Sequence, residues 1–209
     1  MKSYRNSAEV FAEIGEKPVN AFAISVQGTR QDLATYRSAF PQWVSDHGER
    51  GLANWISDRL WANLVSLADS IPDMSVVEKG SLREVLIGIN YRFRVKRHDE
   101  EGNIASYETP SFLDFVLQEP LEAMLPGLEE TRLVAGYEWN KELRAIGAAV
   151  ISLRDGKENV IWKEQLPEPA GESTGLGHVV TPEQSGPTAP IIDLPREIGE
   201  ATEEQPEDQ

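Results

Sequence analysis

The sequence predicts an α+β fold in which N-terminal helices pack on one face of an antiparallel sheet of about five strands. Apolar residues recur at helical spacing in the first third of the chain and at the two-residue spacing of strands over much of residues 82–166. This periodic hydrophobicity stops near Leu166. We therefore expect one globular domain over residues 1–166, helical in 1–72 and mainly strands in 82–166, followed by a C-terminal tail.

The helical half is best marked by residues Gly51–Asp69. Their apolar positions recur every three or four residues and form one core-facing stripe, which comprises Leu52, Trp55, Ile56, Leu60, Leu64 and Leu67. Thr29, followed three residues later by Asp32, resembles a capping box and predicts a helix over 30–39. A shorter helix is expected after Pro41.

Strand patterns and turn residues alternate in the second half. Residues Val85–His98 are rich in β-branched and aromatic side chains, and Asp99–Asn103 has the composition of a hairpin loop. The return strand is then expected at Ile104–Thr109, with Val95 opposite Tyr107.

Further helical and strand elements are expected after this point. Thr109 followed by Pro110 is typical of a helix start and predicts a helix over 110–118. Its residues Phe112, Phe115 and Val116 should point inward. Another helical turn is expected from Pro120. Residues 132–140 alternate as a half-buried strand does. Asp155-Gly156 indicates a type I′ turn that pairs Ile151 with Val160 and Ala149 with Trp162.

Charge is distributed unevenly along the 209 residues. The formal net charge is −15. Residues 167–209 hold ten acids and one base, which gives −9 and leaves −6 on the rest. These 43 residues also hold seven of the 13 prolines, and such a segment cannot bury enough apolar surface to offset its chain entropy. We expect a disordered acidic tail, in which Ile191, Ile192 and Leu194 form an apolar island suited to a linear docking motif.

Composition excludes several kinds of chemistry. The absence of cysteine excludes disulfides, thiolate catalysis and zinc sites with a cysteine ligand. The three histidines have no metal-binding spacing, and neither a nucleophile elbow nor a phosphate loop occurs, so we expect no metal and no cofactor. No apolar run is long enough to span a bilayer or resembles a signal peptide. We therefore expect no membrane contact and a cytoplasmic protein.

Positive charge gathers on one expected strand. Because side chains alternate along a strand, Arg92, Arg94, Lys96 and His98 share one face, and we call them the basic row. One hypothesis is an anion surface that contacts phosphates, with His98 as a candidate catalytic proton-transfer group. The alternative is a solvated face whose bases pair with Glu108, Glu138 or the tail.

The tryptophans also allow two interpretations. Trp43, Trp55, Trp61 and Trp139 could line a ligand pocket, but aromatic residues at helical or strand spacing more often belong to the core.

The leading hypothesis for function is a non-catalytic one. We expect an intracellular adaptor or regulatory protein whose body binds a protein partner and whose acidic tail adds a second contact. The alternative is a nucleic-acid-directed protein, such as a small ribonuclease-like toxin or a toxin–antitoxin or defence accessory, that uses the basic row. A third possibility is a small-molecule enzyme with a pocket between helix and sheet.

Overall fold

The structure, a computed structural model, describes residues 3–118 and 129–169. The helical turn expected from Pro120, tail residues 170–209 and the Ile191, Ile192 and Leu194 island lie outside the described residues. The described part of the tail, residues 167–169, has no regular secondary structure, and its Glu168 forms an ion pair with Arg30 at 3.0 Å.

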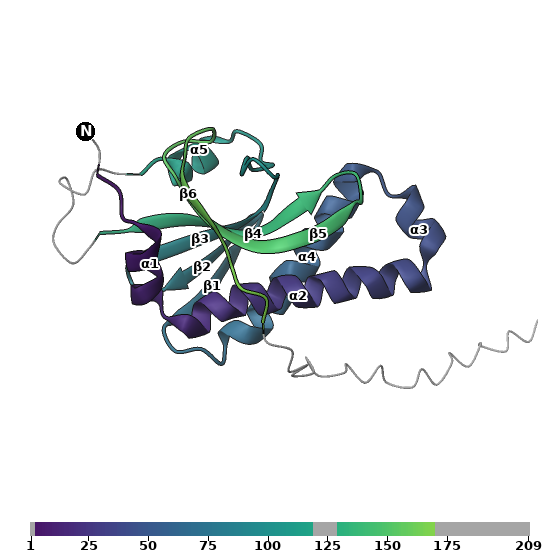
Figure 1. Ribbon diagram of the computed structural model, residues 1–209, viewed down its shortest axis with the longest axis horizontal. Helices are drawn as coiled ribbons and strands as arrows, with labels where there is room; N and C mark the ends of the chain where they lie inside the picture. The colour runs from purple at the N-terminus through teal and green to yellow at the C-terminus, as the bar shows by residue number, and fades with distance from the viewer. Residues whose placement is uncertain (1–2, 119–128, 170–209) are drawn as a thin grey trace, which may run out of the picture. The chain divides into compact units, whose positions relative to one another are not determined.

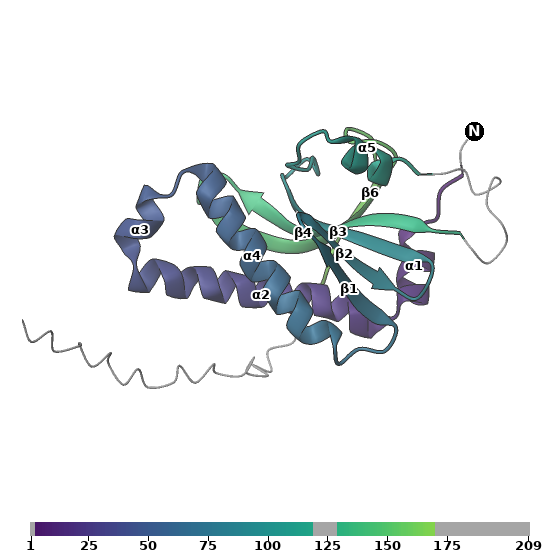
Figure 2. The same cartoon turned by 180° about the vertical axis from the view of Figure 1, so that it is seen from behind.

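Four helices open the chain: α1 (Ser7–Ile14), α2 (Glu16–Ala39), α3 (Pro41–Asp46) and α4 (Glu49–Ala68). Helices α2 and α4 lie side by side and cover one face of the sheet (Figure 1; Figure 2). The expected stripe on α4 is confirmed, because four of its members are buried in the core that α4 shares with α2 and the sheet: Leu52, Ile56, Leu60 and Leu64. None of the described helices is long and apolar enough to cross a membrane.

The expected helix start at Thr29 is wrong. Helix α2 begins at Glu16, so Thr29 lies in its interior with its side chain buried. The Thr29 hydroxyl donates a hydrogen bond to the Ser25 carbonyl oxygen (2.7 Å) and accepts one from the Asn63 amide of α4 (3.2 Å). A threonine side chain can satisfy itself on the preceding helical turn, and here it also joins the two helices.

The sheet has six strands in sequential order: β1 (Met74–Lys79), β2 (Leu82–Ile87), β3 (Tyr91–His98), β4 (Thr131–Asn140), β5 (Ala145–Arg154) and β6 (Val160–Gln165). The expected fold class is confirmed, with one strand more than expected and one parallel pair, β3–β4, in an otherwise antiparallel sheet. Strand β1 was missed, although Gly80-Ser81 is a recognised two-residue hairpin signal. The expectation of one strand over Val85–His98 is wrong, because a turn at residues 88–90 divides this stretch between β2 and β3, which pair with each other.

The expected return strand at Ile104–Thr109 is also wrong. His98 and Ile104 pair, in the register that a five-residue loop predicts, but the pairing ends there. The chain instead forms helix α5 (Pro110–Val116) on the other face of the sheet and re-enters as β4, parallel to β3. A helix in the connection is the usual way to join two parallel strands. The N-cap at Thr109 is confirmed, as is the inward packing of Phe112, Phe115 and Val116.

The β5–β6 hairpin forms in a different register. Leu153 pairs with Trp162 and Arg154 with Val160, so the loop spans Asp155–Asn159. The buried Arg154 guanidinium donates to the carbonyl oxygens of Gly102 and Lys157, both at 2.6 Å. One of these acceptors, Lys157, lies within the five-residue loop, so the loop wraps around the buried side chain.

The contact between β3 and β4 generates a prediction on stability. Gly136 has φ +157°, and a Cβ there would lie 1.8 Å from the Lys96 carbonyl oxygen. We expect Gly136→Ala to lower the free energy of unfolding by about 3 kcal/mol or more, because the backbone must move. Gly48→Ala is the control, since its Cβ would meet nothing within 4 Å and an N-cap change from Gly costs less than about 1 kcal/mol. Urea unfolding followed by tryptophan fluorescence measures both, and equal losses would contradict this account.

Candidate functional site

The basic row lies on the face of the sheet that α5 covers. Arg94 places its guanidinium 4.3 Å from the centre of the Phe115 ring, and the Lys96 ammonium lies 5.5 Å from the Phe112 ring. Helix α5 therefore shields the middle of the row, where cations over aromatic faces gain modest attraction. Burial, and secondarily the charge of Arg94, lower the pKa of Lys96.

Carboxylates neutralise the arginines of the row. Arg94 pairs with Glu84 at 2.8 Å, and both side chains are largely buried. Arg92 lies 3.6 Å from Glu84 and 2.8 Å from Glu130. The partners differ from those considered from sequence, because Glu108 pairs with Lys157 and Glu138 with Lys163. Phosphate binding by the row remains a prediction, and this geometry does not favour it.

His98 lies at the end of the row and is 1% exposed. Its Nε2 is 3.1 Å from the Ser152 hydroxyl oxygen on β5. Burial, followed by the charges of Arg154 and Lys163, lowers the pKa of His98 to about 3. The imidazole is therefore neutral near pH 7, and a candidate proton-transfer group would have no direct path to a substrate in solution. Within the described residues, no group of three His, Asp or Glu side chains is placed to hold a metal ion.

The tryptophans do not gather into one pocket. Trp61 is buried in the core, whereas Trp43 on α3 is 61% exposed. Trp43 stacks on Phe40 with ring centres 4.6 Å apart and an angle of 12° between the planes. Beneath them Tyr36 stacks on Trp55 at 4.8 Å. We call these four residues, together with His47, the aromatic corner.

The aromatic corner is held by side-chain and main-chain contacts. The Tyr36 hydroxyl lies 3.0 Å from His47 Nε2. Arg144, in the β4–β5 turn, donates to the His47 carbonyl oxygen at 3.1 Å, and Arg37 donates to the carbonyl oxygen of Arg144. Leu143 in this turn is 73% exposed. The corner is thus a fixed arrangement of stacked rings whose outer members, Phe40 and Trp43, face solvent.

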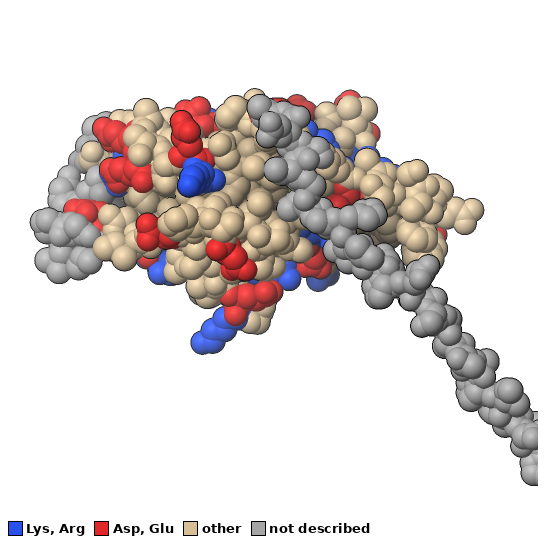
Figure 3. Space-filling model, turned by 90° about the horizontal axis from the view of Figure 1, so that it is seen from below, with Lys and Arg blue, Asp and Glu red and all other residues tan. Residues whose placement is uncertain are grey.

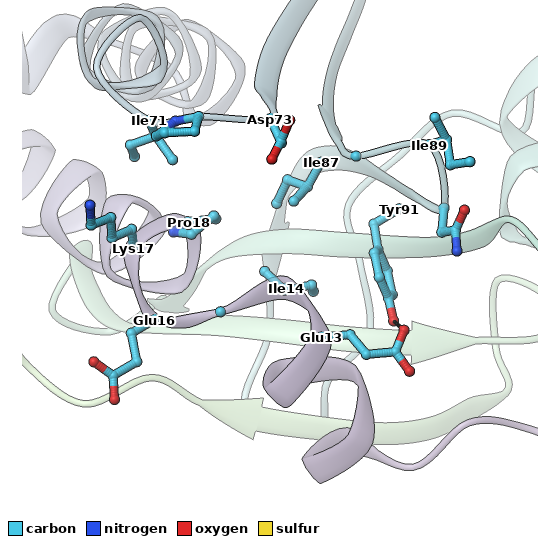
Figure 4. Close-up of a pocket in the computed structure, with 14 residues that line it drawn as sticks. Glu13, Ile14, Glu16, Lys17, Pro18, Ile71, Asp73, Ile87, Ile89 and Tyr91 are labelled. Atoms are coloured by element: carbon cyan, nitrogen blue, oxygen red, sulfur yellow. Dashed lines mark hydrogen bonds between the residues drawn. The ribbon is translucent and has the colours of Figure 1, made fainter.

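A pocket lies at the other end of α2. Its cavity volume is about 570 Å³, and the α1–α2 junction, the α4–β1 connection and the β2–β3 turn surround it (Figure 4). We call it the α1–α2 pocket. Its walls include Ile14, Pro18, Ile71 and Ile87.

One side of this pocket is organised by a hydrogen-bonded triad. Tyr91 donates to Glu13 at 2.6 Å, and Arg5 donates both to the Tyr91 hydroxyl at 2.9 Å and to Glu13. The hydrogen bonds from Tyr91 and Arg5 lower the pKa of Glu13, while burial and the bond to Glu13 raise that of Tyr91. Glu13 is therefore held as a carboxylate in one orientation.

Sequence reasoning identified neither surface. The aromatic pair around Pro41, outside any apolar stripe, was an available signal for the corner. The α1–α2 pocket joins residues from three distant segments, and no local spacing indicates it. No protein-family model matches the chain, and no curated protein or solved structure shows significant similarity to it.

The ion pairs of the row predict that its two arginines differ in their effect on stability. Arg94→Ala leaves the buried Glu84 without its nearest partner, so we expect a loss of about 3 kcal/mol in the free energy of unfolding. Arg92→Ala removes a more exposed side chain and should cost less than about 1 kcal/mol. Urea unfolding of both variants measures the difference, and similar small losses would indicate that the pairs are not important for the fold.

The buried His98 predicts a pH dependence. Between pH 6.5 and about 3 the histidine of the unfolded chain takes up a proton and that of the folded chain does not. Folding is therefore disfavoured increasingly as the pH falls through this range, by up to ~1.4 kcal/mol per pH unit. We expect the unfolding free energy of the wild type to fall more steeply than that of His98→Gln over this range. Parallel curves would show that His98 titrates normally in the folded protein.

Proposed function

We propose that this protein is a non-catalytic adaptor or regulatory protein that binds a protein partner through the aromatic corner. The observation that carries this proposal is the exposed stack of Trp43 (61%) on Phe40 (44%). Tryptophan is among the residues that supply most of the binding energy at protein interfaces. Burying both rings against a partner would remove a large apolar surface from water.

The rigidity of the corner supports the same proposal. Phe40 contacts both the Trp43 ring and the Tyr36 ring, and Tyr36 is itself held by stacking on Trp55 and by its contact with His47, so the corner is ordered before any partner arrives. Side chains that are already ordered lose little conformational entropy on binding. Charge also favours this end of the molecule, because on the face shown in Figure 3 the α3 end is mostly uncharged while Asp and Glu side chains gather toward α1.

The proposal also gives a role to the acidic tail and a location to the protein. The charge of −9 on residues 167–209 would supply a second contact, or a solubilising arm, for a partner held at the corner. A chain without cysteine has no need of an oxidising compartment, so we propose that it acts in the cytoplasm. The nucleic-acid alternative requires arginines open to phosphate, whereas Arg92 and Arg94 already face Glu84 and Glu130.

The proposal predicts that one tryptophan controls partner binding. Tagged full-length protein is purified gently, treated with nuclease, and its bound proteins are quantified by mass spectrometry. We expect a partner in near-stoichiometric amount whose recovery falls about tenfold or more with Trp43→Ala, since such an anchor contributes about 2 kcal/mol. Affinity for the purified partner, measured by calorimetry, should fall by the same factor.

Tyr107→Ala is the matched control, because Tyr107 is also an exposed aromatic residue (77%) but lies in the connection before α5. Recovery of the partner should survive this change. Equal recovery with Trp43→Ala and wild type would overturn the role of the corner. Co-purification of nucleic acid alone, released by moderate salt, would instead support the alternative based on the basic row.

A further inference from the structure

The α1–α2 pocket contains a carboxylate that no described residue pairs with. Asp73 lies in the connection between α4 and β1, and its carboxylate points into the hollow between Ile71 and Ile87 (Figure 4). Glu16 and Lys17 also belong to the lining, but their side chains extend away from the hollow. The pocket therefore presents an apolar wall with the free charge of Asp73 at one side and the triad of Glu13 at the other.

The backbone holds Asp73 in place. Its φ of +61° lies in the left-handed region, which aspartate and asparagine adopt more readily than most residues. Its carbonyl oxygen accepts a hydrogen bond from Gly88 N at 2.8 Å, which ties the α4–β1 connection to the β2–β3 turn. Two walls of the pocket are thus joined directly, and the main chain that carries the Asp73 carboxylate is held without a ligand.

The size and lining of the pocket restrict what it can bind. A volume of about 570 Å³ exceeds that of a single side chain and lies within the range of small-ligand sites. Isoleucine and proline walls favour apolar groups, and an unpaired carboxylate favours a cation. Ile89, which is 79% exposed on the rim, extends the apolar surface outward.

We propose that the α1–α2 pocket binds a short basic segment of a partner protein, with a lysine or arginine directed at Asp73 and a neighbouring apolar side chain against Ile14, Ile71 and Ile87. The charge of the part of the chain that holds the pocket supports this occupant, since residues 1–166 carry a formal charge of −6 and attract cationic segments. The pocket converts that general attraction into a defined contact.

This site is independent of the aromatic corner. The pocket includes the first residues of α2, and the corner includes Tyr36 near its end, so most of a 24-residue helix separates them. At 1.5 Å per residue the whole helix is about 36 Å long. A change at one site should leave binding at the other unaltered, so the two proposals can fail separately.

The test uses nuclear magnetic resonance of the ¹⁵N-labelled full chain with three acetylated tripeptide amides. They are Leu-Lys-Leu, the same peptide with norleucine in place of lysine, and the same peptide with glutamate. We expect the lysine peptide to shift the amides of Gly15, Gly88 and Ile89 in a saturable way at concentrations up to about 10 mM. The norleucine peptide keeps the chain but lacks the charge, so it should bind about threefold or more weakly, and the glutamate peptide should not bind.

Two variants with the same change of charge locate the contact. Asp73→Asn keeps a residue that tolerates the left-handed backbone, and it should weaken the lysine peptide by about threefold to fivefold. Glu16→Gln removes a carboxylate that points away from the hollow and should change the affinity by less than about twofold. Trp43→Ala should have no effect on this peptide.

Several results would overturn the proposal. They are equal binding of the lysine and norleucine peptides, equal weakening by Asp73→Asn and Glu16→Gln, and shifts that spread over the acidic surface without saturating at Gly15 and Gly88. An absence of saturable binding by the lysine peptide would count in the same way. None of these results would alter the expected loss of partner recovery with Trp43→Ala.

Discussion

The parallel pair β3–β4 in the middle of the sheet is the constraint on which the rest of the structure depends. Parallel strands need a long connection, and here that connection places α5 on the face opposite α2 and α4. The centre of the sheet is therefore covered on both sides, as is usual where strands run parallel. The same pairing brings the Lys96 carbonyl oxygen so close to position 136 that only glycine fits there.

Because helices cover both faces of the sheet, the basic row is partly buried in the folded protein. A charged side chain beneath a helix must find a partner, because an unpaired buried charge is costly. Arg94 has two such partners, the carboxylate of Glu84 and the aromatic ring of Phe115. The same covering leaves His98 neutral and surrounded by protein. The sequence of β3 suggests an anion-binding surface, but in the folded protein the basic row is partly buried.

Some local signals in the sequence predicted local structure, since the stripe on α4 and the Thr109 cap depend on neighbouring residues and both were confirmed. The strand over 132–140 was recognised, but its half-buried alternation was wrong, because α5 covers the second face and β4 is buried on both sides from Leu133 to Tyr137. Contacts between residues that are far apart in the sequence were not predictable in this way. The loop after β3 was recognised, yet the strand that pairs with the second edge of β3 comes from beyond α5. The five-residue β5–β6 loop surrounds a buried Arg154 that also reaches the distant Gly102. Likewise, Trp43 and Trp61 are equally apolar in the sequence, and only the tertiary structure separates an exposed ring from a buried one.

The two proposed contacts differ in chemistry in a way that suits one partner. Stacked aromatic rings supply affinity through apolar burial but discriminate little between apolar partners. A pocket with one carboxylate adds little affinity and does distinguish a cation from a neutral or acidic group. Because α2 is a single continuous helix, it would hold the two surfaces at a fixed separation. A partner able to reach both would then make its second contact at high effective concentration, whereas one with the wrong spacing would gain from only one of them.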